Sequence, residues 1–275
     1  MLKTVIRLLA LGVCISFSVQ AKETVTVVGS TSVSHIMDVL ADTYSSTHKD
    51  TTIEVQGIGS TAGINAVKQG AAEIGMSSRV ISSAELDDNY KAITIAHDGI
   101  ALVVNKANPV TNLTREQLIG IYQGKITNWK SINGKDLDMA VVSRENASGS
   151  RFSFEHFMGL TKQVSGFTVS NISPRVLVVS TNGMVKSLVS RNEHAIGYVS
   201  LGSVDDSVKA LSYDNVLPTA ANIESGEYKI ARPFLLMFKQ KGLANDAQQF
   251  IKFVLSNQAQ TIIKDKGYVA IDKKA

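Results

Sequence analysis

The feature that most constrains the fold of this chain is the segment Val142–Phe152. A strand-like run leads to Arg144, and Ser148-Gly149-Ser150 then opens a run whose apolar residues have helical spacing. A helix N-terminus exposes unpaired backbone N–H groups at the positive end of the helix dipole, and an arginine adds a two-pronged donor. The segment therefore predicts an anion site without a nucleophile or base, unless it is only a capped helix beside a surface arginine.

The same arrangement recurs at three other places in the chain. In each, a strand-like run ends in Ser, Thr or Gly residues, and a helix-spaced apolar run follows. The polar residues of these junctions are Gly29–Ser32, Gly57–Gly63 and Ser180–Gly183. Ser and Thr are ordinary helix N-caps, so one such junction is a weak indication of a ligand site. Four of them predict a ligand at the carboxyl ends of the strands, where helix N-termini converge.

The first residues predict a cleaved export signal. A short basic segment precedes an apolar stretch, residues 8–19, that is too short to span a bilayer comfortably. A small-residue cleavage pattern ends at Ala21, so we expect a signal peptide over residues 1–21 and export to the periplasm. Because Cys14 is the single cysteine and lies in this leader, the mature chain is expected to hold no disulfide and no thiolate metal site.

Composition and charge exclude several classes of protein. Without Lys3 and Arg7 of the leader, the chain has 26 basic and 24 acidic residues, a net charge of +2. The basic residues are scattered and lack interleaved aromatics, so nucleic-acid binding is not expected. No later apolar run reaches about 18 residues, so no membrane anchor is expected. The five histidines lack metal-ligand spacing and no Gly-x-Ser-x-Gly elbow occurs, so we expect no metal, no cofactor and no catalytic residues.

Short strand-like runs alternate with amphipathic helices, which predicts an α/β architecture. Thr114–Gln117 is a capping box that begins one helix, and residues 247–255 place their apolar side chains on one helical face. The polar stretch 213–228 predicts an excursion over the surface. Longer apolar runs predict buried strands at residues 100–104, 195–199 and 231–238.

Six short motifs occur in an order that resembles one known family. They are residues 55–63 (VQGIGSTAG), residues 73–78 (EIGMSS), Asn128-Trp129, Arg144 with Ser148-Gly149-Ser150, residues 195–198 (AIGY) and Arg232-Pro233. The set resembles the phosphate-binding proteins of bacterial phosphate ABC transporters over nearly the whole chain after the leader. The resemblance implies a non-enzymatic, monomeric periplasmic receptor that captures inorganic phosphate and delivers it to a membrane ABC permease.

The resemblance also implies a fold and a division of the chain. The family has the α/β type II periplasmic binding protein fold, in which two lobes joined by crossing strands close over one ligand. By this likeness, lobe I consists of residues 22–99 and 229–275, and lobe II consists of residues 100–228.

The residues that would bind phosphate follow from the same resemblance. In the family, loops at helix N-termini and one arginine donate hydrogen bonds to the anion. The matching positions are Thr31 and Ser32 in the first loop, Ser60 in the second, the arginine Arg144, and Ser148, Gly149 and Ser150 after it. Ser150 stands where the family has threonine. Because serine keeps the hydroxyl, this exchange is expected to have little effect on phosphate binding.

One position departs from the family pattern. Where the family carries a Ser-Asp pair, whose aspartate accepts a hydrogen bond from the protonated phosphate oxygen, this chain has Ser77 and Ser78. Ser78 stays among the expected ligand-binding residues. Asp98 is the expected replacement for the carboxylate, unless it only caps a turn. Arg79 either adds a second cation near the anion or forms a salt bridge at the rim.

Two other functions fit part of this pattern. A receptor for another tetrahedral oxyanion, such as sulfate or molybdate, would use the same donors. A secreted phosphate-ester hydrolase would need a loop serine as its nucleophile. A dinucleotide site is not expected, because Gly57-x-Gly59-x-x-Ala62 resembles the fingerprint but no acidic residue ends the next strand about 20 positions on.

Overall fold

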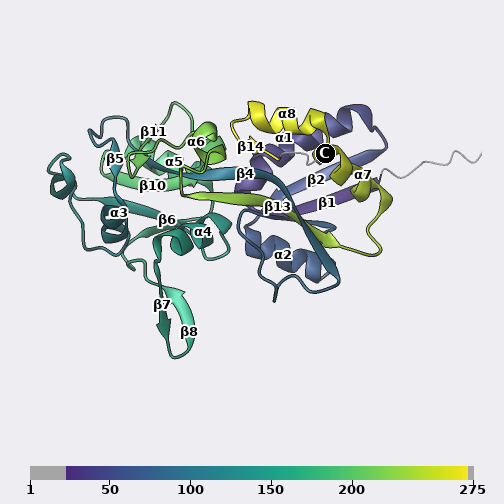
Figure 1. The fold of residues 1–275 in the computed structure, drawn as a ribbon, viewed down its shortest axis with the longest axis horizontal. Coiled ribbons are helices and arrows are strands. Elements are labelled where there is room, and N and C mark those ends of the chain that lie inside the picture. The colour runs from purple at the N-terminus through teal and green to yellow at the C-terminus, as the bar shows by residue number, and fades with distance from the viewer. Residues whose placement is uncertain (1–22, 272–275) are drawn as a thin grey trace, which may run out of the picture.

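The computed structural model of the protein describes residues 23–271, so the predicted leader over residues 1–21 lies outside the described residues. Within that range, ten strands form one sheet whose main path is β2-β1-β3-β13-β4-β10-β6-β9, with β11 and β14 paired to β4. Figure 1 shows an elongated molecule in which β4 and β13 run across the middle, between two groups of helices. The predicted α/β architecture is confirmed.

The elements have the following bounds. The strands are β1 Glu23–Gly29, β2 Thr51–Gly57, β3 Ile74–Ser77, β4 Tyr90–Val104, β5 Asn112–Leu113, β6 Ala140–Arg144, β7 Thr161–Val164, β8 Phe167–Ser170, β9 Leu177–Val179, β10 Ala195–Ser200, β11 Lys209–Ala210, β12 Ser212–Tyr213, β13 Ala231–Lys239 and β14 Val269–Ala270. The α-helices are α1 Thr31–Thr47, α2 Ser60–Lys68, α3 Arg115–Tyr122, α4 Gly149–Met158, α5 Asn182–Arg191, α6 Ala220–Glu224, α7 Asn245–Val254 and α8 Asn257–Asp265. In the described part of the chain, no helix is both long enough and apolar enough to cross a membrane.

The long strands β4 and β13 connect the two halves of the molecule. They pair antiparallel from Tyr90 opposite Lys239 to Gly99 opposite Ala231, and β4 then continues as the antiparallel partner of β10. The register places Asp98 opposite Arg232. Opposed residues of an antiparallel pair project to the same side of the sheet, so the strand geometry brings this acid and base together.

Two large hydrophobic cores hold the molecule together. One buries side chains from residues 25–96 and 234–268. The other buries side chains from residues 100–230. Both are built from helix faces with apolar spacing packed on the sheet, as expected for layered α/β domains. We infer that these cores are those of lobe I and lobe II as the resemblance divides them.

The expected helices at Thr114 and at residues 247–255 are confirmed, and Thr114 makes the full capping box with Gln117. The prediction of a surface excursion over residues 213–228 was wrong in part. Tyr228 is 1% exposed and its hydroxyl donates to the Ile100 carbonyl at 2.7 Å, while the stretch also contains α6. Aromatic anchors at the ends of this polar stretch bind it to the core of lobe II.

Candidate anion-binding site

Four helices begin directly after strands of the sheet, and their first turns meet between the lobes. The N-caps of α1, α2, α4 and α5 are Ser30, Gly59, Ser148 and Thr181. The side chains of Ser30, Ser148 and Thr181 accept N–H groups of the following turn, as N-caps do. Gly59 has φ of +104° and offers no capping side chain. The four predicted junctions are therefore real helix starts. Along the sheet, β1 and β2 run antiparallel to β6 and β9, so the starts of α1 and α2 face the starts of α4 and α5 from the opposite lobe.

Side chains join the first turns of α1, α4 and α5. Ser32 Oγ and Ser150 Oγ lie 3.1 Å apart, and Asn182 Nδ2 donates to Ser32 Oγ at 3.1 Å. All three side chains are buried. Because Ser32 belongs to lobe I and its two partners belong to lobe II, the hydroxyl of Ser32 links the lobes.

A second group of hydroxyls comes from α2 and the residue after β3. Ser78 Oγ accepts the Ser30 hydroxyl at 2.7 Å and lies 3.4 Å from Ser60 Oγ, which accepts the Ser78 N–H at 3.1 Å. Gly149 lies against this group, since a side chain there would clash with the hydroxyls of Ser60 and Ser78. Glycine at position 149 thus allows α4 of lobe II to approach α2 of lobe I.

Arg144 ends β6 and is fully buried. Its Nε and Nη2 donate to the Glu145 carboxylate at 3.1 Å each, and Nη2 also donates to the Ser180 carbonyl at 2.7 Å. Nη1 donates to Asn182 Oδ1 at 3.3 Å, while Nη2 reaches Thr31 Oγ1 of lobe I at 3.0 Å. Lobe II therefore fixes the guanidinium in one orientation, facing the start of α1.

A second buried arginine, Arg232 on β13, lies in the same cluster and was missed by the sequence reasoning. Its Nη1 donates to Ser150 Oγ at 2.8 Å and to Ser78 Oγ at 3.4 Å, and its Nη2 donates to Ser32 Oγ at 3.1 Å. The guanidinium thus connects hydroxyls of both lobes. A charged residue inside the apolar run 231–238 was the available signal, because a charge is rarely buried unless it is paired.

Asp98 is the counter-ion of Arg232. Its Oδ2 accepts from Arg232 Nε at 3.2 Å and Nη2 at 2.9 Å, and its Oδ1 accepts the Leu201 N–H at 3.1 Å. Burial raises the pKa of the Asp98 carboxyl above its ordinary value, and the charge and hydrogen bonds of Arg232 oppose that rise. Because Arg232 Nη2 is shared between Asp98 and Ser32, the carboxylate lies at the edge of the hydroxyl cluster.

Arg79 lies beside the cluster and forms a salt bridge. Its Nη2 and Nη1 donate to the two oxygens of Glu85 at 2.6 and 2.9 Å. This hydrogen-bonded arginine is the main cause that lowers the pKa of the Glu85 carboxyl to about 2. Of the two roles expected for Arg79, the structure contains the salt bridge.

The nine predicted site residues, Asp98 included, all lie in or beside this cluster, and Ser148 differs from the others. Its Oγ accepts the Arg151 N–H at 3.3 Å, so its hydroxyl serves the helix as an N-cap. Asn182 was missed, although its junction was recognised. We call the following set the socket: Thr31, Ser32, Ser60, Ser78, Arg144, Gly149, Ser150, Asn182 and Arg232.

The chemistry of the socket is that of an oxyanion site. Each guanidinium has its own carboxylate, Glu145 for Arg144 and Asp98 for Arg232, so the ion pairs are balanced before any ligand binds. Hydroxyls, guanidinium N–H groups and helix N-termini all favour a small anion rich in acceptor oxygens. Among residues 23–271, no group of three or more His, Cys, Asp or Glu side chains could hold a metal ion.

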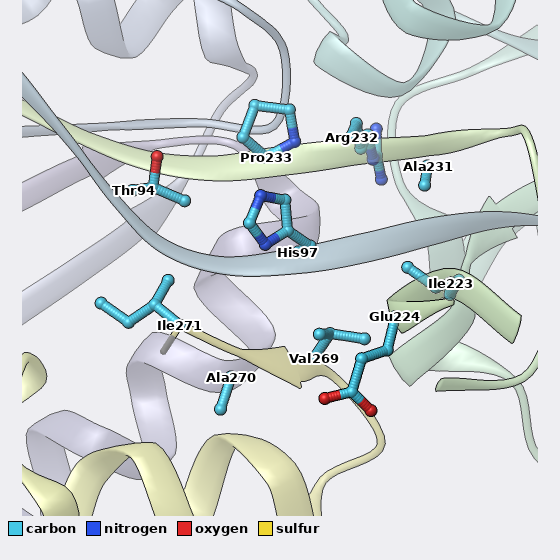
Figure 2. A pocket seen from close by; sticks show the side chains of 10 residues that line it. All are labelled: Thr94, His97, Ile223, Glu224, Ala231, Arg232, Pro233, Val269, Ala270 and Ile271. Atoms are coloured by element: carbon cyan, nitrogen blue, oxygen red, sulfur yellow. The ribbon is translucent and has the colours of Figure 1, made fainter. Parts of the chain in front are cut away.

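A separate pocket of about 550 Å³ borders the crossing strands. Figure 2 shows its lining on β4, β13, β14 and α6, with His97 and Glu224 as titratable side chains. Arg232 borders this pocket as well, but its guanidinium donates to Asp98 and to the hydroxyls of the socket. The socket, and not this pocket, therefore contains the buried guanidinium and hydroxyl groups that suit an oxyanion.

The fold and the socket define a class, the two-lobed solute-binding proteins, and the family model described as the PBP superfamily domain matches residues 18–258. The phosphate-binding protein PstS of Borreliella burgdorferi is 30% identical over 251 residues, which cover 90% of each chain. The chain belongs to the PBP superfamily and, within it, to the family of phosphate-binding proteins that this relative represents.

Two solved structures are similar over almost the whole chain. An ABC-type phosphate transport receptor from Vibrio cholerae has 48% identity and a TM-score of 0.75, covering 90% of this chain and 100% of that one. A putative phosphate ABC transporter substrate-binding protein with bound phosphate, from Clostridium perfringens, has 40% identity and a TM-score of 0.85, covering 91% and 100%. The predicted type II periplasmic binding protein fold and the family resemblance are confirmed.

Proposed function

We propose that this protein is a periplasmic solute-binding protein that captures inorganic phosphate and delivers it to a membrane ABC permease. The observation that carries the proposal is the convergence of four helix N-termini and two buried arginines on hydroxyls shared by two lobes. The relative named as a phosphate-binding protein and the similar structure with bound phosphate support the choice of ligand. The similar phosphate transport receptor supports the permease as the partner.

In the proposed complex, phosphate replaces bonds that the socket groups make to one another. The anion accepts hydrogen bonds from the serine hydroxyls, from Arg144 and Arg232, and from N–H groups at the helix starts. Bonds to charged groups are about twice as strong as neutral ones. A micromolar Kd requires only about −8 kcal/mol, which several such bonds supply after the costs of ordering and desolvation.

We further propose that the protein is a monomer without enzymatic activity and that the predicted leader exports it. Within the described structure, the hydroxyls of Ser32, Ser60, Ser78 and Ser150 bond to other hydroxyls, to amide or backbone N–H groups or to guanidinium groups. No histidine or carboxylate accepts a proton from them there. A serine nucleophile needs such a base, so the socket favours binding over the hydrolase alternative.

Calorimetry of the mature protein with phosphate, sulfate and molybdate tests the proposal directly. Phosphate is expected to bind tightly and the other two anions more weakly. Tighter binding of sulfate or molybdate would identify that oxyanion as the ligand in place of phosphate. A parallel assay with a chromogenic phosphate ester is expected to show no turnover, and sustained turnover that depends on a socket serine would establish the hydrolase instead.

Phosphate is expected to raise the melting temperature. A ligand that binds only the folded state at a thousandfold excess over its Kd stabilises that state by about 4 kcal/mol. For a chain of this size, such a gain corresponds to roughly 10 °C. Thermal unfolding is measured with sodium phosphate, sodium sulfate and sodium chloride at equal ionic strength. A shift with sulfate and none with phosphate would contradict the assignment.

Asp98→Asn is expected to reduce the preference for phosphate over sulfate by roughly tenfold, since an unmet buried acceptor or donor costs about 1–3 kcal/mol. Monohydrogen phosphate carries a proton that the Asp98 carboxylate can accept, and sulfate carries none. Asparagine keeps the size of the side chain but also donates. Both affinities are measured at pH 8 for both proteins. An unchanged ratio of phosphate to sulfate affinity would mean that Asp98 only positions Arg232 and does not accept the phosphate proton.

A further inference from the structure

The lobes also meet outside the socket, where the first half of α4 faces the segment after β3. The guanidinium carbon of Arg79, in lobe I, lies 4.9 Å from the ring centroid of Phe152, in lobe II. Phe152 is 49% exposed, whereas Phe154 two positions later is fully buried in the core. The core therefore does not explain the aromatic residue at position 152, and its contact across the lobe boundary does.

Arg79 presents a rigid cation to this ring. The residue is 4% exposed, and Glu85, the Val80 carbonyl and Thr61 Oγ1 accept from its Nη atoms. Its buried Nε–H has no hydrogen-bond partner within residues 23–271. An aromatic face within about 6 Å compensates such a cation electrostatically. Because these hydrogen bonds already hold the guanidinium in place, its contact with Phe152 costs little further side-chain entropy.

Neighbouring contacts set the position of α4 against lobe I. The Thr61 N–H donates to the Ala147 carbonyl at 3.2 Å, and the Ser153 hydroxyl donates to the Ser78 carbonyl at 3.3 Å. Gly59 allows this approach, since a side chain there would meet the Ala147 carbonyl at 2.9 Å. Phe152 therefore reaches Arg79 only when α4 lies against lobe I, which is also the arrangement that assembles the socket.

We propose that Phe152 and Arg79 form an interlobe latch that stabilises the closed form and slows the release of phosphate without touching the anion. The inference rests on the proposed function and adds to it a residue pair that sets residence time. A contact made only in the closed form multiplies the closed-to-open ratio by its own Boltzmann factor. For a partly desolvated cation–π pair this factor is about 3- to 30-fold.

The counter-ion of the latch keeps its charge over the physiological range of pH, because the pKa of the Glu85 carboxyl is lowered to about 2, mainly by its hydrogen bond to Arg79. Glu85 also neutralises the local charge, so Arg79 adds little long-range attraction for phosphate. The latch is therefore expected to change the dissociation rate far more than the association rate.

Phe152→Ala tests the latch, with Phe167→Ala as the matched control. Phe167 is 74% exposed and lies on β8, which pairs with β7 in a hairpin that projects away from the body of the molecule in Figure 1. The same truncation is therefore made there away from the contact between the lobes. The dissociation of radiolabelled phosphate is followed after a chase with unlabelled phosphate. Phe152→Ala is expected to release phosphate about 3- to 30-fold faster, with the control within about twofold of the wild type.

Two further variants separate the cation–π contact from apolar packing. Phe152→Leu keeps apolar bulk but lacks the ring, so it is expected to release phosphate about as fast as Phe152→Ala. In a double-mutant cycle, Arg79→Gln and Phe152→Ala are expected to be non-additive. If Arg79→Gln does not fold, the release rates of Phe152→Ala and Phe152→Leu, compared with the wild type, test the latch by themselves.

The outcomes distinguish the latch from the proposed function. Release from Phe152→Ala at the wild-type rate overturns the latch, while phosphate binding by the wild type in the same assay leaves the proposed function standing. Release from Phe152→Leu at the wild-type rate also overturns the cation–π pair. Failure of the wild type itself to bind phosphate overturns the proposed function.

Discussion

Arg144→Ala is expected to weaken phosphate binding by about two powers of ten or more, because a bidentate, charge-assisted donor is lost from a desolvated site. The Arg144 guanidinium is buried and reaches from lobe II to Thr31 of lobe I. Its carboxylate partner, Glu145, keeps 27% of its side chain exposed and stays hydrated after the substitution. The variant is therefore expected to fold, and calorimetry with phosphate measures the loss.

The matched control is Arg191→Ala. Arg191 lies at the exposed end of α5, in the same lobe, so this variant removes one positive charge without touching the socket. Its affinity for phosphate is expected to stay within about threefold of the wild type, as for an exposed charge screened by solvent. If Arg144→Ala weakens phosphate binding by less than threefold, Arg144 does not contact the anion, and the socket is not the phosphate site as proposed.

The helix starts could be predicted because their signals are local. A serine or threonine that ends a strand-like run and precedes helix-spaced apolar residues caps the helix through bonds to the next two or three residues. Ser30 and Ser148 do so in the structure. The carboxyl ends of neighbouring parallel strands lie at the same edge of a sheet, so the α/β alternation predicts that the starts of α1 and α2 lie together, and likewise those of α4 and α5. The meeting of the two pairs depends on how the lobes face each other, which local patterns do not give.

The pairing inside the socket could not be predicted from local patterns. Asp98 and Arg232 are 134 residues apart and meet only because β4 and β13 pair in one register. A one-residue shift of that register would turn one of the two side chains to the other face. Asn182 lies in a recognised junction, but no local pattern indicates that its amide reaches Ser32, which is 150 residues away in the sequence.

Arg232→Met is expected to destabilise the folded protein by about 3–5 kcal/mol at pH 8, because it leaves the Asp98 carboxylate buried without its counter-ion. Burial already raises the pKa of Asp98 above its ordinary value of 3.8, and loss of Arg232 removes the main opposing cause. A carboxyl with a raised pKa in the folded state stabilises that state when protonated. Relative to the wild type, the variant is therefore expected to lose stability as pH rises from about 4 through the raised pKa.

The double variant Arg232→Met/Asp98→Asn separates the role of the ion pair in folding from its role in binding. Removing the charge of Asp98 along with that of Arg232 eliminates the unpaired buried ion, so thermal and urea unfolding are expected to show most of the lost stability restored and little dependence on pH. Phosphate affinity is expected to stay at least about tenfold below the wild type, because the guanidinium that contacts Ser32, Ser78 and Ser150 is still absent. If the double variant instead regains wild-type affinity, Arg232 acts only in the fold and Arg144 is the cation that binds the anion.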